Sequence, residues 1–186
     1  MAITINGNGT ITGYTPVADG SITAAKLASG AITKSALPAG TIINTTYGAH
    51  ATTGMSTSST SFTNYQNSEI TVTKLRSGNG SGGSVLLILA SAWLEFSGSS
   101  ANSKHLSYSL MRDGNELTGK THGLGNLYSG NAQGYQSSAD MKYMDTVSLN
   151  AGNYVYSVCI KSTNSYNIQI GNSQRLGTWQ ILEIAT

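Results

Sequence analysis

The residues that could carry out chemistry are few and are scattered through the sequence. His50, His105 and His122 lie in unrelated segments without metal-ligand spacing, whereas a structural zinc site needs about four convergent ligands. Asp140 and Asp145 come nearest to a glycosidase pair, whose carboxyl groups lie roughly 5 to 10 Å apart, but nothing in the sequence places them across a cleft. We therefore expect no bound metal, no cofactor and no enzymatic activity.

Two other enzyme motifs are incomplete. Residues 78–83 (GNGSGG) have the glycine density of a phosphate-binding loop, but no Gly-Lys-Ser/Thr follows. The next segment predicts a strand, so no helix N-terminus would face an anion, and a flexible loop between strands is the favoured interpretation. The Gly-x-Ser-x-Gly motif of serine hydrolases is absent from the sequence.

Tyrosine is the residue type that points to recognition. The chain has 10 Tyr and 2 Phe, and a tyrosine offers a large contact area with a polar rim, which suits both interfaces and sugar ligands. Most of these tyrosines are expected to complete the core or a subunit interface. Tyr128 and Tyr135, together with His122, lie in the glycine-rich stretch 119–136 and are the candidates for surface recognition.

Composition excludes several partners. Only 10% of the residues are charged, the formal net charge is +2, and no run of Lys or Arg could follow phosphates, so we expect no nucleic-acid binding. The longest apolar run, residues 85–94, is about half of what a membrane helix needs, so we expect no membrane insertion. Cys159 is the single cysteine and sits in an apolar segment, where a buried small hydrophobe is the favoured role.

From residue 41 to residue 186 the pattern is that of an all-β domain. Short apolar or alternating segments are separated by Gly, Asn and Ser clusters, which predicts an antiparallel, jelly-roll-like β-sandwich of about eight to ten strands. The apolar segment 85–96 predicts a central strand covered on both faces. Asp113-Gly114 predicts a tight hairpin turn.

Two of the segments alternate strictly enough to assign side chains to faces. In segment 69–75 the period of two places Ile70, Val72 and Lys74 together. In segment 178–184 it places Trp179, Ile181 and Glu183 on one face.

Residues 1–40 form a different region. They contain no Trp, Phe, Cys or Arg and one Tyr, so they cannot bury enough apolar surface to fold alone and are expected to be an extended N-terminal arm. A ten-residue unit occurs twice, with Gly-x-Ile-Thr at 20–23 and at 30–33. This repetition suits binding by many small contacts to a partner or to symmetry mates. The expected anchoring residues are Ile3, Ile5, Ile11, Ile22, Leu27, Ile32 and Leu37.

Several blocks of the sandwich region occur in a suggestive order: TSFT (60–63), SEITVT (68–73), GSVLLILASA (83–92), LMRDGNEL (110–117), LNAGNYVYSV (149–158) and ILEIA (181–185). In this order they resemble the trimeric jelly-roll domains of bacteriophage tail fibres, tailspikes and head decoration proteins. Those domains are similar in shape to tumour-necrosis-factor and complement C1q heads. The Gly-x-Ile-Thr repeats are similar to the N-terminal segments of phage fibre-like proteins.

The resemblance implies a homotrimer on the surface of a virion, without catalysis. About 40 extended residues reach roughly 130 to 145 Å, which is little for a fibre shaft and favours a capsid decoration (cement) protein bound to the major capsid protein. A tail fibre or tailspike tip bound to tail proteins is the alternative within this class. A carbohydrate-binding module is the alternative from another class, and it is compatible with the virion role if the protein also contacts a host-surface glycan.

Overall fold

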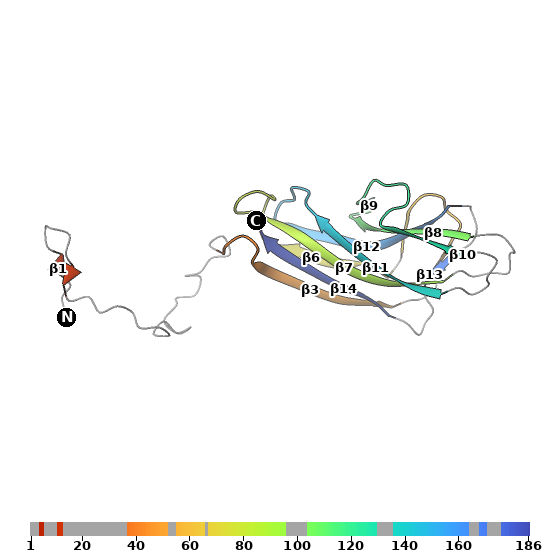
Figure 1. Cartoon of the computed structure of the whole chain (residues 1–186), viewed down its shortest axis with the longest axis horizontal. Helices are drawn as coiled ribbons and strands as arrows, with labels where there is room; N and C mark the ends of the chain where they lie inside the picture. The colour runs from red at the N-terminus through yellow and green to blue at the C-terminus, as the bar shows by residue number, and fades with distance from the viewer. Residues whose placement is uncertain are drawn as a thin grey trace. The chain divides into compact units, whose positions relative to one another are not determined.

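The computed structural model describes residues 4–5, 11–12, 37–51, 55–65, 67–95, 104–129, 136–163, 168–170 and 176–186 (Figure 1). The chain divides into two units, Met1–Ala36 and Leu37–Thr186. In the first unit, β1 (Thr4–Ile5) and β2 (Ile11–Thr12) pair antiparallel, with Ile5 opposite Ile11. None of the described residues forms a helix long and apolar enough to cross a membrane.

The second unit is built from two antiparallel sheets, which we call the β7 sheet and the β12 sheet after their central strands. The β7 sheet contains β3 (Ile42–Ala51), β4 (Met55–Thr57), β7 (Ser84–Glu95), β11 (Gln136–Asp145), β13 (Ile168–Ile170) and β14 (Leu176–Ala185). The β12 sheet contains β5 (Thr63–Asn64), β6 (Ile70–Lys74), β8 (Lys104–Arg112), β9 (Asn115–Glu116), β10 (Gly125–Ser129) and β12 (Gly152–Ser162).

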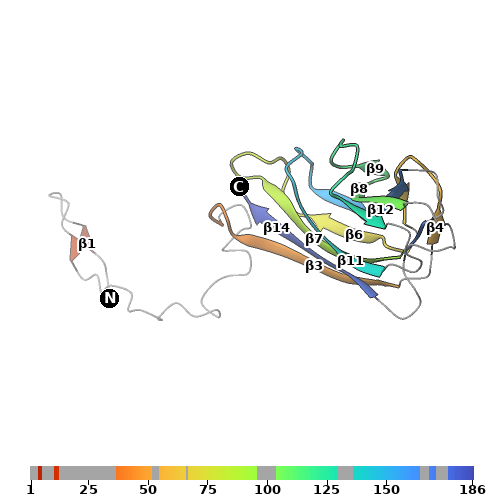
Figure 2. The ribbon, with the colours of Figure 1, turned by 45° about the vertical axis from the view of Figure 1, so that its right-hand side comes forward.

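The order of the strands is that of a jelly roll. In the β7 sheet, β14 pairs with β7 as far as Ser91 and β13 pairs with it again from Leu94, so β13 continues the line of β14, and β4 likewise continues β3. The lines then run β3/β4, β14/β13, β7, β11 in one sheet and β10, β8, β12, β6/β5 in the other. Figure 2 shows the two layers. The long strands β3, β6, β7, β8, β11, β12 and β14 belong alternately to one sheet and the other, which confirms the predicted jelly-roll sandwich.

The core lies between the two sheets and is filled by alternate residues of each strand. Ile70 and Val72 face inward from β6, and Trp179 and Ile181 face inward from β14, as the period of two predicted. The indole Nε1 of Trp179 donates to the carbonyl of Ser68 at 2.9 Å, so the largest core side chain has a partner for its polar atom.

The predicted hairpin at Asp113-Gly114 is confirmed. Arg112 of β8 lies opposite Asn115 of β9, so the loop has two residues, and their φ angles are 49° for Asp113 and 79° for Gly114. Two successive positive φ angles are required by the type I′ turn, which suits the twist of antiparallel strands. Asp113 also ties the turn to β12, because its carboxylate accepts a hydrogen bond from the amide of Val155 at 2.9 Å.

A cluster of buried charges closes the end of the sandwich where β6 and β14 end and β7 begins. Glu183 is 1% exposed, and its carboxylate accepts hydrogen bonds from the amides of Leu75 (2.9 Å) and Arg76 (3.0 Å) and from the Ser84 hydroxyl (2.6 Å). Lys74 is 2% exposed, and burial lowers the pKa of its ammonium, while Glu183 and Asp145 oppose that effect. The sheets are therefore joined here by polar contacts instead of apolar packing.

The ammonium of Lys74 is held by backbone oxygens. It donates to the carbonyl of Arg76, to that of Gly78 at 3.0 Å and to that of Leu149 at 3.2 Å. These carbonyls belong to the loop after β6 and to the loop before β12, so one lysine links two loops that are far apart in the sequence.

Candidate assembly interface

The outer face of the β7 sheet is the most distinctive surface among the described residues. Directly paired residues in an antiparallel sheet point to the same side, so the register defines this face. Across β3, β14, β7 and β11 its rows are Ile42, Ile184, Val85; then Thr45, Leu182, Leu87, Met144; then Tyr47, Gln180, Leu89, Lys142; then Ala49, Thr178, Ser91, Asp140; and finally Trp93, Ser138. We call this set the β7 face.

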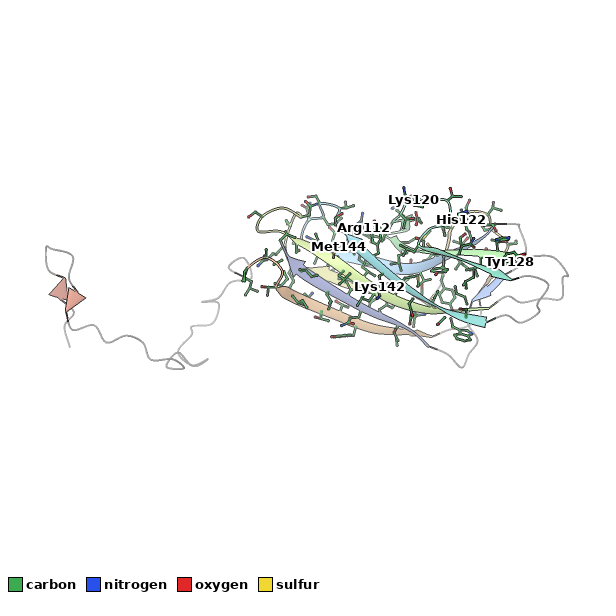
Figure 3. The ribbon with its side chains drawn as sticks, viewed as in Figure 1. Arg112, Lys120, His122, Tyr128, Lys142 and Met144 are labelled. Atoms are coloured by element: carbon green, nitrogen blue, oxygen red, sulfur yellow. The ribbon has the colours of Figure 1, made fainter. Side chains whose placement is uncertain are left out.

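The β7 face is apolar at the end where β14 ends and β7 begins. Within the chain, Tyr47 is 70% exposed, Ile42 54% and Met144 41%, while Leu87 and Leu182 are half-buried. A contiguous apolar surface of this kind on a sheet marks a contact site for another molecule. The labels of Met144 and Lys142 in Figure 3 mark the β11 side of the face.

The two faces of β7 have different environments. The strand is central in its sheet, between β14 and β11, as predicted. Its Leu86, Ile88 and Leu94 are buried in the core, but Leu87 and Leu89 on the other side are left partly exposed by the described residues. Among the described residues, the prediction of cover on both faces is therefore confirmed for the core side of β7, while its other side is left half-buried.

The rows of the β7 face that lie further from its apolar end carry polar groups around a hollow of about 400 Å³. The hydroxyls of Ser91 and Thr178 lie 2.8 Å apart and hydrogen bond to each other across β7 and β14. Tyr47, Gln180 and Lys142 line the same hollow. Leu89, Asp140 and Thr178 also line it, and it is large enough to receive side chains of a docked protein.

Where it is exposed, the outer face of the β12 sheet is mostly polar, and its polar side chains hydrogen bond to one another. The Thr73 hydroxyl donates to the Asn153 side chain at 2.8 Å, and the Asn64 amide donates to the Glu69 carboxylate at 2.8 Å. Val155 is the one large hydrophobic residue of this sheet's outer face that is exposed among the described residues outside β10, at 37%. Among the described residues, the exposed part of the β12 sheet's outer face is therefore mostly polar, whereas the β7 face exposes contiguous apolar rows.

Two of the predicted recognition residues, His122 and Tyr128, lie toward the other end of the sandwich (Figure 3). Tyr128 is at the end of the edge strand β10, is 56% exposed, and its ring centroid is 4.6 Å from that of His105. His122 is exposed in the preceding loop, and its Nδ1 lies 3.3 Å from the Ser107 hydroxyl. Tyr135 lies outside the described residues.

The two aspartates considered as a carboxylate pair lie on opposite sides of the β7 sheet. Asp140 is exposed on the β7 face, whereas Asp145 is 1% exposed and points into the sandwich. Asp145 pairs with Arg112 and accepts a hydrogen bond from the Tyr156 hydroxyl at 2.7 Å. The pKa of Tyr156 is raised, mainly because the hydroxyl is buried and also because of this hydrogen bond. A separation of five residues along a strand changes the face, so these carboxylates cannot act on one substrate.

The histidines are also apart. His50 is 3% exposed beside Trp179, and burial lowers the pKa of its imidazole. His105 and His122 belong to the β12 sheet and its loop. Among the described residues no group of three or more His, Cys, Asp or Glu side chains could hold a metal ion.

The predicted anchoring residues fall mostly in the first unit. Ile3, Ile22, Leu27 and Ile32 lie outside the described residues. Ile5 and Ile11 are paired in β1 and β2, as described above. Leu37 is half-buried at the start of the second unit. Three residues later, the amide of Gly40 donates a hydrogen bond to the carbonyl of Ala185 at 2.8 Å. Residues 37–41 thus belong with the sandwich.

Comparison with known proteins gives a weak structural similarity and no sequence match. No known protein family matches the sequence, and no curated protein matches it. Among solved structures, the chain is similar to the Eiger TNF of S. frugiperda, with a TM-score of 0.31 and 10% sequence identity. The alignment covers 73% of this chain and 94% of that one. The assignment of a jelly roll rests on the strand order given above.

Proposed function

We propose that this protein is a homotrimeric structural protein of a bacteriophage virion, which decorates the capsid surface with its jelly roll and is anchored by residues 1–36. The observation that carries the proposal is the β7 face, whose apolar rows the described residues leave uncovered. Burial of such a face between identical copies gives a closed, soluble assembly. The order of the sequence blocks and the Gly-x-Ile-Thr repeats support the placement on a phage particle.

Cyclic symmetry suits this face better than a two-fold axis would. The apolar rows lie at one end and toward the middle of the sheet, while the exposed Asp140 and Lys142 lie on the edge strand β11. A ring in which one patch contacts a different patch of its neighbour allows the β11 edge of one copy to pack on the β3 and β14 side of the next. Analytical ultracentrifugation of the full chain at micromolar concentration tests this: a trimer is expected, and a stable monomer contradicts the proposal.

Removal of residues 1–36 is expected to abolish attachment to particles while the trimer remains. We expect this result because the described core residues all belong to Leu37–Thr186, so the proposed anchor and the assembly face lie in different units. The cut falls before residue 37 because the backbone from Gly40 onward pairs with β14. Cosedimentation with purified phage heads and, separately, with purified tails measures attachment.

The two particle preparations separate the possible outcomes. Binding of the full chain to heads supports the capsid role, and binding to tails alone replaces it with the tail-fibre alternative. A truncated protein that still binds heads contradicts the anchor assignment. Thermal unfolding of the truncated protein, with a transition like that of the full chain, is the control for folding.

A glycan-binding role is a second candidate, favoured by the exposed ring of Tyr128 against His105. An aromatic face held by a neighbouring ring is a platform on which a sugar can stack. If this surface binds glycans, Tyr128→Ala lowers affinity for any hit on a glycan array by about fivefold, since one stacking contact contributes about 1 kcal/mol. Tyr47→Ala, at an exposed tyrosine of the other sheet, is the matched control; equal binding by both variants removes this candidate.

A further inference from the structure

The two sides of the β7 face that would meet in the proposed ring change character in the same order along the strands. One side is the edge strand β11, and the other is formed by β3 and β14. Along β11 the outward residues of three successive rows are Met144, Lys142 and Asp140 (Figure 3). In the same three rows the other side carries Leu182, then Tyr47 with Gln180, then Thr178. Both sides therefore run from apolar to polar in one direction.

Lys142 is the residue of β11 that most needs a partner in such a contact. It is exposed, and no hydrogen bond or ion pair joins it to another described residue. Burial of an ammonium without a partner opposes assembly, because its hydration is lost and nothing replaces it. The β3 and β14 positions of the β7 face hold no charged residue, and Glu95 takes a register position two rows beyond Ser91 on β7. The partner on the β3 and β14 side therefore has to be a neutral group.

Tyr47 is the neutral group that suits an ammonium. Its side chain is 70% exposed, and the face of a tyrosine ring attracts a cation. Tyr47 and Lys142 lie in the same row, but β14 and β7 separate them, so the two positions are about 14 Å apart within one chain. Gln180 lies beside the ring and its Nε2 donates to the Tyr47 hydroxyl at 3.4 Å, which leaves its amide oxygen as a second acceptor for an ammonium.

We propose that the ammonium of Lys142 of one copy lies over the ring of Tyr47 of the next copy around the homotrimer. The inference rests on the proposed assembly through the β7 face and adds the contact that sets its register. A shift of one row toward the apolar end, about 7 Å along the strands, would place the carboxylate of Asp140 on the negative face of this ring. A shift the other way would separate Lys142 from the ring.

The rows on either side of this contact are complementary in the same register. Met144 of one copy reaches Leu182 of the next, which is an apolar contact. Asp140 reaches Thr178, whose hydroxyl is free to donate to a carboxylate when Ser91 donates to Thr178 Oγ1 across their 2.8 Å contact. Rotation about an axis leaves heights along that axis unchanged, so rows that meet at equal heights place the three-fold axis along the strands.

Cysteine pairs test this register directly. Tyr47→Cys is combined with Lys142→Cys in the full chain, and Tyr47→Cys with Ser138→Cys is the matched control, whose second cysteine lies on the same strand two rows away. A disulfide needs Cα atoms within about 7 Å, so neither pair can close within one chain. Cys159 does not compete, because it is buried and burial raises the pKa of its thiol.

The pair in one row is expected to give a covalent trimer on a non-reducing gel, because each copy contributes both cysteines to the ring. The control pair is expected to stay uncross-linked, and the reduced variants should share the circular dichroism spectrum of the original protein. Cross-linking by the control pair, or by neither pair while the original protein sediments as a trimer, overturns the contact and leaves the assembly. A covalent dimer as the end product indicates a two-fold contact and overturns both. A monomeric original protein overturns the proposed function itself.

The chemistry of the contact is tested by removal of the charge. Lys142→Gln is expected to raise the dissociation constant of the trimer by about tenfold or more, because three contacts are lost at once. Lys142→Arg and Tyr47→Phe keep a cation and a ring and are expected to stay within about threefold of the original protein. Lys120→Gln is the matched control at an exposed lysine outside the β7 face. Equal dissociation constants for Lys142→Gln and this control, measured by sedimentation equilibrium, overturn the contact between the cation and the ring.

Discussion

Replacement of Glu183 with alanine is expected to lower the free energy of unfolding by about 3–5 kcal/mol, as for other buried ion clusters that lose one member. The carboxylate is the common acceptor for two backbone amides and one hydroxyl at the closed end of the sandwich. Alanine removes this acceptor from the two amides, whereas the Ser84 hydroxyl still has the Arg76 carbonyl at 3.4 Å. An amide left without an acceptor costs about 1–3 kcal/mol, so the two amides together cost about 2–6 kcal/mol, which includes the expected range.

The buried ammonium of Lys74 makes the loss of stability larger than the loss of the hydrogen bonds alone would. Lys74 is buried and its pKa is already lowered by desolvation, with Glu183 acting against that effect. Without the carboxylate the charged ammonium is less stable, and its links to the loops at Gly78 and Leu149 weaken with it. We therefore expect the two loops to lose protection from amide hydrogen exchange in the Glu183→Ala variant.

Urea unfolding at one fixed protein concentration measures the effect, because assembly makes stability depend on concentration. Glu183→Gln is expected to fall between alanine and the original protein, since an amide oxygen retains part of the acceptor capacity. Glu69→Ala is the matched control at an exposed carboxylate and should change stability by less than about 1 kcal/mol. A Glu183→Ala variant as stable as this control would show that the cluster does not stabilise the fold.

The faces of individual strands could be predicted from the sequence, because alternation depends on strand geometry alone. Ile70, Val72 and Lys74 share an inner face, as do Trp179, Ile181 and Glu183. What alternation could not predict is that the charged residues at these strand ends are fully buried. Their burial depends on loops that cover them from elsewhere in the sequence, such as the one containing Leu149. That is a tertiary contact, and no local pattern encodes it.

The candidate interface could be predicted in part. The continuous apolar run 85–94 indicated two apolar faces on β7, but the sequence did not tell whether the second was covered by the same chain. The place of Asp140 and Lys142 on that face was not predicted, and Asp140 was considered only as part of a carboxylate pair, because only the pairing of β11 with β7 places both residues there. A signal was present: Ala139 and Met141 are buried while Asp140 and Lys142 are exposed, and this alternation is visible in the sequence.

Replacement of Leu87 with lysine is expected to convert the trimer into a folded monomer. Leu87 lies in the middle of the row formed by Thr45, Leu182 and Met144, so the substitution places a charge in the apolar part of the face. A hot-spot position of this kind contributes 2 kcal/mol or more, which corresponds to an increase of at least about thirtyfold in the dissociation constant. The fold itself should persist, since the side chain is half-buried in the single chain and a lysine amine can extend to water.

Val155→Lys provides the matched control for Leu87→Lys. It makes an equivalent change from an aliphatic residue to lysine on a central strand, but on the outer face of the β12 sheet, where Val155 is 37% exposed. Sedimentation equilibrium should find a monomer for Leu87→Lys and a trimer for Val155→Lys, with similar circular dichroism spectra for both. A trimer in both variants would place the interface elsewhere on the molecule. Dissociation of both would mean that assembly responds to added charge and not to the β7 face, because only one of the two substitutions lies on that face.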